Sequence, residues 1–448
     1  MVPFIRTLKS VSWRAATSRP YDGIPINYNF PACCVKLIRT RNSFSPISTF
    51  GGFFMQDFEF YSPTKMIFGR GTEMQVAQHI RSFGGSRIFV VYGGQSAVKS
   101  GLIPRVLDCL TQAGLPYETL GGVHPNPRLE LARQGVARAI AFGADFVLAV
   151  GGGSVIDTAK AIADGVANPQ ADLWDFWLKK QLPTCALPVG VILTIPAAGS
   201  ESSDSAVLTR DDTLEKRGLS TNLHRPRFAI LNPELTFTLP RFQVTCGIVD
   251  IMMHTLDRYF NPVTDNELTD EIAQGLLRST IKNGRRAMEH PGNYHAMSEL
   301  MWAGSLSHNG LTGLGGRQDF APHQLGHELS AKFDYAHGAT LSAVWGSWAS
   351  YCMDANPARF AQYGIQVWGL DPNQETEALA QEAIAATTAF FRSLGMPTCL
   401  SELGCGVLTE DVLEDLAFRC TFRGARTIGT FKVLSYEDIL AIYRMANR

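Results

Sequence analysis

The chain of 448 residues lacks the features that mark several classes of protein. Its nine cysteines include no CxxC motif and form no disulfide framework of a short chain, which favours free thiols in a reducing compartment. The longest uncharged run, LPTCALPVGVILTIPAAGS, contains three prolines, so we interpret VGVILTI within it as a buried strand and not as a membrane span. The 40 Lys and Arg residues are balanced by 41 Asp and Glu residues and form no basic face. We therefore expect neither a membrane nor a nucleic-acid partner.

Acidic residues are almost missing from the first 54 residues, which hold seven Lys and Arg and the single acid Asp22. This Arg- and Ser-rich composition is similar to that of an organellar transit peptide. The alternative, which we favour, is a non-native or misassigned extension over residues 1–55, with Met55 as the working start. The first interpretation predicts an organelle as the location of the protein, and the second predicts the cytoplasm.

Two kinds of hydrophobic pattern follow this segment. Up to about residue 239, continuous apolar runs such as SRIFVVY and ADFVLAV alternate with helical stretches, which is typical of a parallel sheet covered by helices. After Pro240 the strand-like runs stop, and amphipathic helical segments take their place. We predict an α/β dinucleotide-binding domain over residues 56–239 and an all-helical metal-binding domain over residues 240–448. The active site is expected in the cleft between them.

Histidine is scarce, with ten in the chain, yet several histidines are spaced as metal ligands would be. Asp250 and His254 are four residues apart in GIVDIMMHTLDRYF, so on a helix they face the same way. His323, His327 and His337 follow in HQLGHELSAKFDYAHG. Three imidazoles with one carboxylate suit Fe(II) or Zn(II) better than Ca²⁺ or Mg²⁺. A single helical histidine is more often structural, so spacing alone leaves both roles open.

Two glycine-rich turns are candidates for binding a dinucleotide. ADFVLAV-GGGS-VIDTAKAIA reads as strand, turn and helix, and its turn at residues 151–154 could cradle a pyrophosphate at the start of the helix. It lacks the GxGxxG fingerprint, so close packing is an equally simple explanation. Asp157 could orient this loop or a ribose. The turn at residues 93–96 has no carboxylate and has Lys99 nearby, which favours NADP(H) over NAD(H).

These segments occur in order with YSPTKMIFGRGTE, VHPNP, PAAGSES and FAILNPELTFTLP. From about Phe58 to the end, the chain resembles the iron-containing (group III) alcohol dehydrogenases, and among them the bacterial NADPH-dependent butanol dehydrogenases and broad-specificity aldehyde reductases. The resemblance implies a homodimer and metal ligation by Asp250, His254, His323 and His337. It places His327 as a catalytic residue beside nicotinamide and substrate. It assigns the cofactor contacts to Gly93, Gly94, Ser96, Asn126, Gly152, Gly153, Ser154, Asp157, Thr194 and Lys216.

The implied chemistry is hydride transfer between NADP(H) and a primary alcohol or aldehyde, with Fe²⁺ favoured and Zn²⁺ as the alternative Lewis acid. One departure from the family is Ala198, where threonine is common. Two other functions were weighed. A lyase similar to dehydroquinate synthase would need Lys and Arg residues beside the metal for a phosphorylated substrate, and the segment 250–337 shows no such cluster. An inactive structural relative would not be expected to keep the ligands and the glycine turns.

Overall fold

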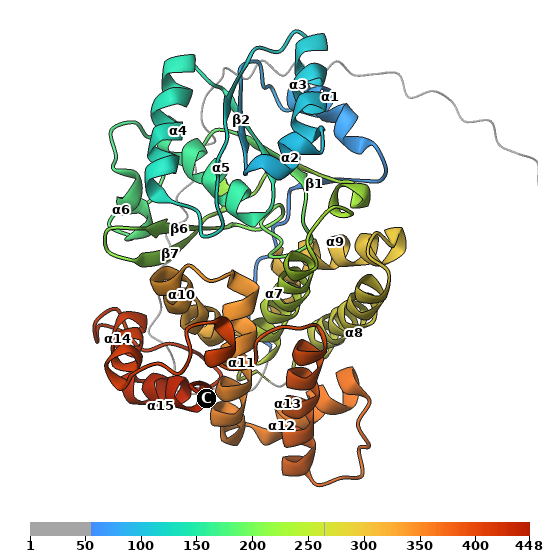
Figure 1. Cartoon of the computed structure of the whole chain (residues 1–448), viewed down its shortest axis with the longest axis vertical. Helices are drawn as coiled ribbons and strands as arrows, with labels where there is room; N and C mark the ends of the chain where they lie inside the picture. The colour runs from blue at the N-terminus through green and yellow to red at the C-terminus, as the bar shows by residue number, and fades with distance from the viewer. Residues whose placement is uncertain (1–54, 264) are drawn as a thin grey trace, which may run out of the picture. The chain divides into compact units, whose positions relative to one another are not determined.

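The computed structural model describes residues 55–263 and 265–448 (Figure 1). Residues 1–54 lie outside this range, so the interpretation of the extension and its consequence for location stay predictions. No helix among the described residues is long and apolar enough to cross a membrane.

A six-stranded parallel sheet forms the first part of the fold, in the order β1-β8-β5-β4-β2-β3. Its strands are β1 (Lys65–Phe68), β2 (Ile88–Tyr92), β3 (Tyr117–Leu120), β4 (Phe146–Gly151), β5 (Val189–Leu193) and β8 (Phe228–Leu231). The three apolar runs predicted as strands are β2, β4 and β5, which lie in the interior of the sheet and are almost wholly buried. The predicted parallel sheet is thus confirmed.

Helices cover both faces of this sheet. The helices of this part are α1 (Val76–Ser82), α2 (Gln95–Lys99), α3 (Leu102–Gln112), α4 (Leu129–Phe142), α5 (Gly153–Ala167) and α6 (Leu173–Trp177). On β2, Ile88 and Val90 pack with α1 and α3, whereas Phe89 and Val91 pack with α4 and α5 (Figure 1). Successive side chains of a strand point to opposite faces, so a strand buried on both faces must be apolar throughout.

A small antiparallel hairpin, β6 (Ser205–Arg210) and β7 (Glu215–Ser220), is separate from the main sheet. No pattern in the sequence indicated this hairpin. Its second strand, EKRGLS, alternates between exposed or half-buried and buried positions and carries three charged residues. This strand has no continuous apolar run that would mark it in the sequence. In the folded chain, β7 contacts α10.

The second part is helical, as predicted. It contains α7 (Arg241–Tyr259), α8 (Glu267–Glu289), α9 (Tyr294–His308), α10 (Ala321–Phe333), α11 (His337–Cys352), α12 (Pro357–Tyr363), α13 (Thr376–Ser393), α14 (Glu410–Cys420) and α15 (Tyr436–Ala446). Single turns of helix occur at Thr72–Gln75, Asn222–His224, Pro233–Thr236, Leu311–Gly313, Met353–Ala355, Gly364–Trp368 and Ser401–Leu403. The predicted domain border at residue 240 falls between β8 and α7 and stays a prediction.

Close backbone contacts at two glycines bring the elements of the site together. A Cβ atom on Gly247 of α7 would lie 2.1 Å from the carbonyl oxygen of Pro196, which follows β5. A Cβ atom on Gly338 of α11 would lie 2.3 Å from the carbonyl oxygen of Cys246 on α7. Both distances are too short for any larger residue without a shift of the backbone. The start of α11, including His337, therefore packs directly against α7.

Candidate functional site

One large cavity, of about 1040 Å³, lies at the carboxyl ends of β2, β4 and β5 and is closed by α7, α10 and α11. Carboxyl ends of parallel strands are the usual place for ligands in such sheets. Every predicted site residue except Gly94 lines it, namely Gly93, Ser96, Asn126, Gly152, Gly153, Ser154, Asp157, Thr194, Lys216, Asp250, His254, His323, His327 and His337. The structure therefore brings both predicted turns and the predicted ligands to one cavity.

Three of the four predicted metal ligands converge around the carboxylate of Asp250. Its Oδ1 atom lies 3.9 Å from Nε2 of His323 and 3.8 Å from Nε2 of His337. One ligand atom from each of these three residues lies within 4.8 Å of the other two. Donor atoms held about 2.1 Å from a tetrahedral metal are about 3.4 Å apart, so the spacing needs only a small contraction.

The polar atoms of this cluster that lack a hydrogen-bond partner among the described residues are also suited to bind a cation. Asp250 Oδ1 and His323 Nε2 are buried, and neither has a hydrogen-bond partner among the described residues. Buried polar atoms are normally paired. Burial raises the pKa of the Asp250 carboxyl to about 6, against the opposing effect of His323 and Lys216. A divalent cation would pair with these atoms and keep the carboxylate ionised.

His254 is not one of the three residues whose ligand atoms all lie within 4.8 Å of one another, although it also contacts Asp250. Its Nε2 atom is 3.4 Å from Asp250 Oδ1, and it is also 3.1 Å from Nδ1 of His308 at the end of α9. His308 Nδ1 lies 2.8 Å from the carbonyl oxygen of Ala198, which can only accept, so this nitrogen carries the hydrogen. His308 was not predicted, because it stands alone in SLSHNGL with no second ligand type at helical spacing.

Five imidazole rings thus form a continuous row along the cavity. The ring centres are 3.9 Å apart for His308 and His254, and 4.3 Å apart for His254 and His323. The row continues over 5.2 Å from His323 to His337 and over 5.3 Å from His337 to His327. Burial holds the pKa well below its usual value for His254, His308, His327 and His337. Neutral imidazoles are the form that can bind a metal.

Asp257, one turn after His254 on α7, orients His323 through a hydrogen bond. Its Oδ2 atom accepts a hydrogen bond of 2.6 Å from Nδ1 of His323, and its side chain is fully buried. A proton fixed on Nδ1 leaves Nε2 of His323 free to bind a cation. Asp257 was not predicted as a site residue, although it lies inside the motif that contains Asp250 and His254.

Replacing Asp257 with Asn is expected to weaken metal binding by about 10- to 100-fold, since the amide no longer holds His323 in one tautomer. The measurement is a titration of metal-free protein with Co²⁺ or Zn²⁺ against a chelating dye. Asp265→Asn, at an exposed position after α7, is the matched control. Equal affinities for the two variants would contradict the supporting role of Asp257.

The wall opposite the metal cluster is the turn between β4 and α5. Gly152 precedes the first residue of α5, Gly153, so the free N–H groups of the helix start point at the turn. A Cβ atom on Gly152 would lie 2.3 Å from Cγ2 of Ile195, which requires glycine there. Both oxygens of Asp157 accept hydrogen bonds, from Ser200 Oγ at 2.6 Å and from the Val207 amide at 2.9 Å. These contacts tie α5 to Ser200 and to β6, and the two predicted roles of Asp157 stay predictions.

Lys216 and Asn126 form a buried pair on the same cavity. Lys216 Nζ donates to Asn126 Oδ1 at 2.8 Å, and Asn126 Nδ2 donates to Asp334 Oδ1 at 2.9 Å. Burial lowers the pKa of Lys216 to about 8, although Asp250 acts in the opposite direction. The place of Lys216 beside Asn126 puts a hydrogen-bond donor in the cavity.

The turn after β2 is open to solvent. Gly94 has φ −76°, a value that any residue adopts, and a Cβ atom there would meet nothing within 4 Å. Gly93 and Ser96 face the cavity on either side of it. Thr194, just after β5, is tied to the glycine turn by a hydrogen bond of 3.1 Å from its amide to the Gly151 carbonyl.

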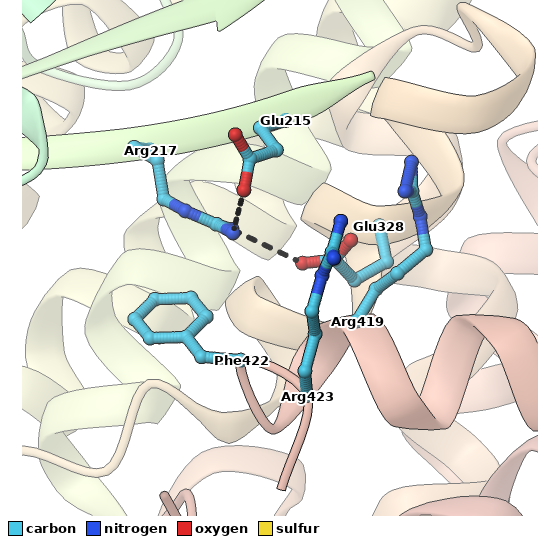
Figure 2. Close-up of a pocket in the computed structure, with 6 residues that line it drawn as sticks. All are labelled: Glu215, Arg217, Glu328, Arg419, Phe422 and Arg423. Atoms are coloured by element: carbon cyan, nitrogen blue, oxygen red, sulfur yellow. Dashed lines mark hydrogen bonds and ion pairs between the residues drawn. The ribbon is translucent and has the colours of Figure 1, made fainter. Parts of the chain in front are cut away.

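A second cavity, of about 80 Å³, is lined by residues of β7, α10 and α14 and by Phe422 and Arg423 (Figure 2). Its lining includes Arg217 and Glu328, the residues that directly follow Lys216 and His327 of the large cavity. Figure 2 shows Arg217 of β7 between two carboxylates: it donates to Glu215 at 2.8 Å and lies 3.6 Å from Glu328 of α10. The Arg217–Glu328 contact joins β7 to α10, the two elements that carry Lys216 and His327.

Glu328 makes the free energy of unfolding of the chain depend on pH. Burial raises the pKa of its carboxyl from 4.5 to about 7, and Arg217 and Arg419 oppose the shift only in part. The folded chain then binds this proton more tightly than the unfolded chain, so the contribution of Glu328 falls as pH rises from about 4.5 to 7. Glu328→Gln resembles the protonated form at every pH. It is expected to raise the free energy of unfolding at pH 8 by about 3 kcal/mol and to change it little at pH 5.

Urea unfolding of Glu328→Gln and the wild type at the two pH values checks this prediction. Glu382→Gln, at an exposed position of α13, is the control for a change of charge alone. A variant that is less stable than the wild type at pH 8 would show that the ion pair with Arg217 outweighs the cost of burying the charge.

The chain matches two family models over most of the described range. Residues 63–233 match "Iron-containing alcohol dehydrogenase", and residues 244–447 match "Fe-containing alcohol dehydrogenase family, C-terminal". NADH-dependent butanol dehydrogenase A of Clostridium acetobutylicum is 39% identical over 87% of this chain and 99% of its own length. NADPH-dependent aldehyde reductase YqhD of Escherichia coli is 37% identical over 78% of this chain and 90% of its own length.

A solved structure agrees with these relatives. The crystal structure of NADH-dependent butanol dehydrogenase A from Thermotoga maritima superposes with a TM-score of 0.85 at 34% identity, covering 88% of this chain and all of that one. The chain therefore belongs to the iron-containing alcohol dehydrogenase family, and this membership implies an oxidoreductase that acts on CH–OH groups with a divalent metal and a nicotinamide cofactor.

Proposed function

We propose that this protein interconverts primary alcohols and aldehydes with NADP(H), using Fe²⁺ or, as the alternative, Zn²⁺. The observation that carries the proposal is the convergence of Asp250, His323 and His337 in the same cavity as the glycine turn of β4 and α5. When bound, the cation polarises the oxygen of the substrate and the nicotinamide carries the hydride. The proposed ligands are Asp250, His254, His323 and His337.

The other residues of the cavity would bind and orient. The amides at the start of α5 suit a pyrophosphate, because the helix end offers unpaired N–H groups and a partial positive charge. Gly152 allows the backbone to approach closely for this contact, because it has no side chain. Lys216 and Asn126 would fix the ribose and nicotinamide side. His327, at the end of the imidazole row, is proposed to hold or relay the proton that accompanies hydride transfer.

The preference for NADP(H) rests on the turn after β2. The names of the relatives do not decide it, because one is NADH-dependent and another NADPH-dependent. A carboxylate at this strand end would favour NAD(H) by binding the ribose hydroxyls and repelling the additional phosphate. Residues 93–96 of this chain are Gly, Gly, Gln and Ser, with Lys99 one turn later. They offer hydrogen bonds and positive charge to a phosphate, and no repulsion.

Introducing the missing carboxylate is expected to reverse the preference. Gly94→Asp should lower kcat/KM for NADPH by at least about tenfold and raise the NADH to NADPH ratio, because the added charge repels the phosphate. The backbone and the open space at Gly94 accept the side chain without strain. Gly94→Asn, of equal size and no charge, is the control. A wild type that prefers NADH, or a Gly94→Asp variant with an unchanged ratio, would contradict the assignment.

The proposed function has a direct test. Purified protein is mixed with NADPH or NADH and a series of aldehydes, and loss of nicotinamide absorbance is followed, with the metal content measured on the same sample. A lyase similar to dehydroquinate synthase would regenerate the nicotinamide within each turnover and give no net loss. The relatives with printed activities are dehydrogenases and reductases, which favours net oxidation of NADPH. The homodimer and the cytoplasmic location stay predictions.

A further inference from the structure

Arg258 on α7 is a buried cation without a matching anion. It is 4% exposed, and within residues 55–263 and 265–448 its side chain makes one hydrogen bond, from Nη1 to the carbonyl oxygen of His254, at 2.6 Å. Its Nε atom is buried and has no partner in the described part of the chain. Arg359, 2% exposed, shows the usual arrangement of a buried arginine, since two of its nitrogens donate to the carboxylate of Asp270. Burial of an unpaired charge costs several kcal/mol in general, so structural arginines are normally paired.

Arg258 lies on the same helix face as two of the proposed metal ligands. Asp250, His254 and Arg258 are spaced four residues apart on α7, so they lie on one face of the helix and all three line the large cavity. Four residues of helix advance about 6 Å along its axis. The guanidinium carbon lies 4.8 Å from the centre of the Phe320 ring, which covers one face of the group. Apart from the Nη1 contact to His254, the edge of the guanidinium makes no hydrogen bond to the described residues. Arg258 therefore presents donors roughly one helical turn beyond His254.

The charged residues near Arg258 that the structure describes do not form an ion pair with its guanidinium group. Arg225, the other arginine that lines the cavity, donates to the Ser202 carbonyl at 3.0 Å and lies 3.7 Å from the Asp204 carboxylate. Asp204 and Asp257 act on Arg258 from a longer distance, and Asp257 is already bonded to His323. Burial lowers the pKa of Arg258 to about 10, so it remains a cation at neutral pH.

We propose that Arg258 binds a carboxylate at the far end of the substrate, so that the preferred substrates are short ω-oxo acids and ω-hydroxy acids. This proposal rests on the proposed function and names the substrate class of the same site. A substrate carboxylate supplies the missing anion and accepts two N–H groups of the guanidinium. An extended four-carbon chain spans about 3.8 Å between its end carbons and about 6 Å between its terminal oxygens, which is similar to the roughly 6 Å between the two helical positions. The carboxylate is unchanged in the reaction, which adds hydride and a proton to the aldehyde.

The test compares two aldehydes of equal chain length, 4-oxobutanoate and butanal, with NADPH and the metal-loaded enzyme. For the wild type, kcat/KM is expected to be at least about tenfold higher for 4-oxobutanoate, the size of one charge-assisted hydrogen-bonded contact. Arg258→Met should raise KM for 4-oxobutanoate about tenfold or more and lower the ratio of kcat/KM for 4-oxobutanoate to kcat/KM for butanal by a similar factor. Arg241→Met, at an exposed arginine on the same helix, is the matched control and should change neither.

The outcomes separate this proposal from the proposed function. A wild type that reduces butanal as well as or better than 4-oxobutanoate overturns the role of Arg258 and leaves the proposed function intact. An Arg258→Met enzyme that keeps the wild-type ratio also overturns it. No loss of NADPH with either aldehyde overturns both. Should Arg258→Met fail to fold, Arg258→Lys keeps the charge without the paired donors, and a several-fold rise in KM for 4-oxobutanoate alone is the expected result.

Discussion

His323→Ala is expected to abolish both metal binding and turnover. His323 contributes the buried Nε2 atom that has no protein partner among the described residues and lies 3.9 Å from Asp250 Oδ1. Its loss removes one of the three converging ligands and leaves Asp257 without the imidazole that it holds. We expect metal content to fall from about one ion per chain to a small fraction. Turnover should fall by about 10³-fold or more, since Lewis-acid stabilisation is worth several kcal/mol.

The measurement is elemental analysis and NADPH-dependent aldehyde reduction on the same anaerobically purified sample. His295→Ala, at an exposed histidine of α9, is the control for loss of an imidazole outside the cavity. His254→Ala and His337→Ala are expected to lower metal and activity together as well. Retention of a full complement of metal by His323→Ala would contradict the ligand assignment.

His327→Ala is expected to separate activity from metal binding. Its ring centre is 5.3 Å from that of His337 at the end of the imidazole row, and in the residues that the structure describes its ring makes no hydrogen bond. Burial and the neighbouring Lys216 keep its pKa well below the usual value, so the ring is neutral and free to exchange a proton with a substrate. General acid–base catalysis typically contributes about 10²- to 10⁴-fold. We expect turnover to fall about 100-fold while the metal content stays that of the wild type.

This prediction is checked by kcat over a range of pH, with metal content on the same preparations. His327→Gln, which keeps polar atoms but cannot take up a proton, should be as slow as His327→Ala. Full turnover of His327→Ala at every pH would rule out the proton-handling role. Loss of metal from the same variant would instead make His327 part of the metal centre.

The elements of the fold that the sequence predicted are those with an unmistakable local pattern. The runs that became β2, β4 and β5 are buried on both faces, so they are apolar at every position. The hairpin of β6 and β7 was missed because EKRGLS is polar and half-exposed, and its pairing is visible only in three dimensions. The helical second part followed from amphipathic spacing after Pro240.

In the site, too, the residues that could be predicted are those with a local sequence pattern. Asp250 and His254 could be found because both lie on one face of α7, and the glycine turn because it joins a buried strand to a helix. His308 and Arg258 gave no such signal. Each is a single residue whose meaning comes from partners on other elements, such as Ala198, or from the absence of a carboxylate nearby in the described structure. Long-range pairing of this kind leaves no local pattern in a sequence.

We propose that a divalent metal held by Asp250 and its histidines supports hydride exchange between NADPH and an aldehyde. The most direct measurement removes the metal with a chelator and adds back Fe²⁺ or Zn²⁺ in steps, following NADPH oxidation with butanal at each step. Activity should be absent without metal, rise in proportion to bound ion, and level off near one ion per chain. Full NADPH-dependent turnover in the chelator-treated, metal-free protein would contradict the claim.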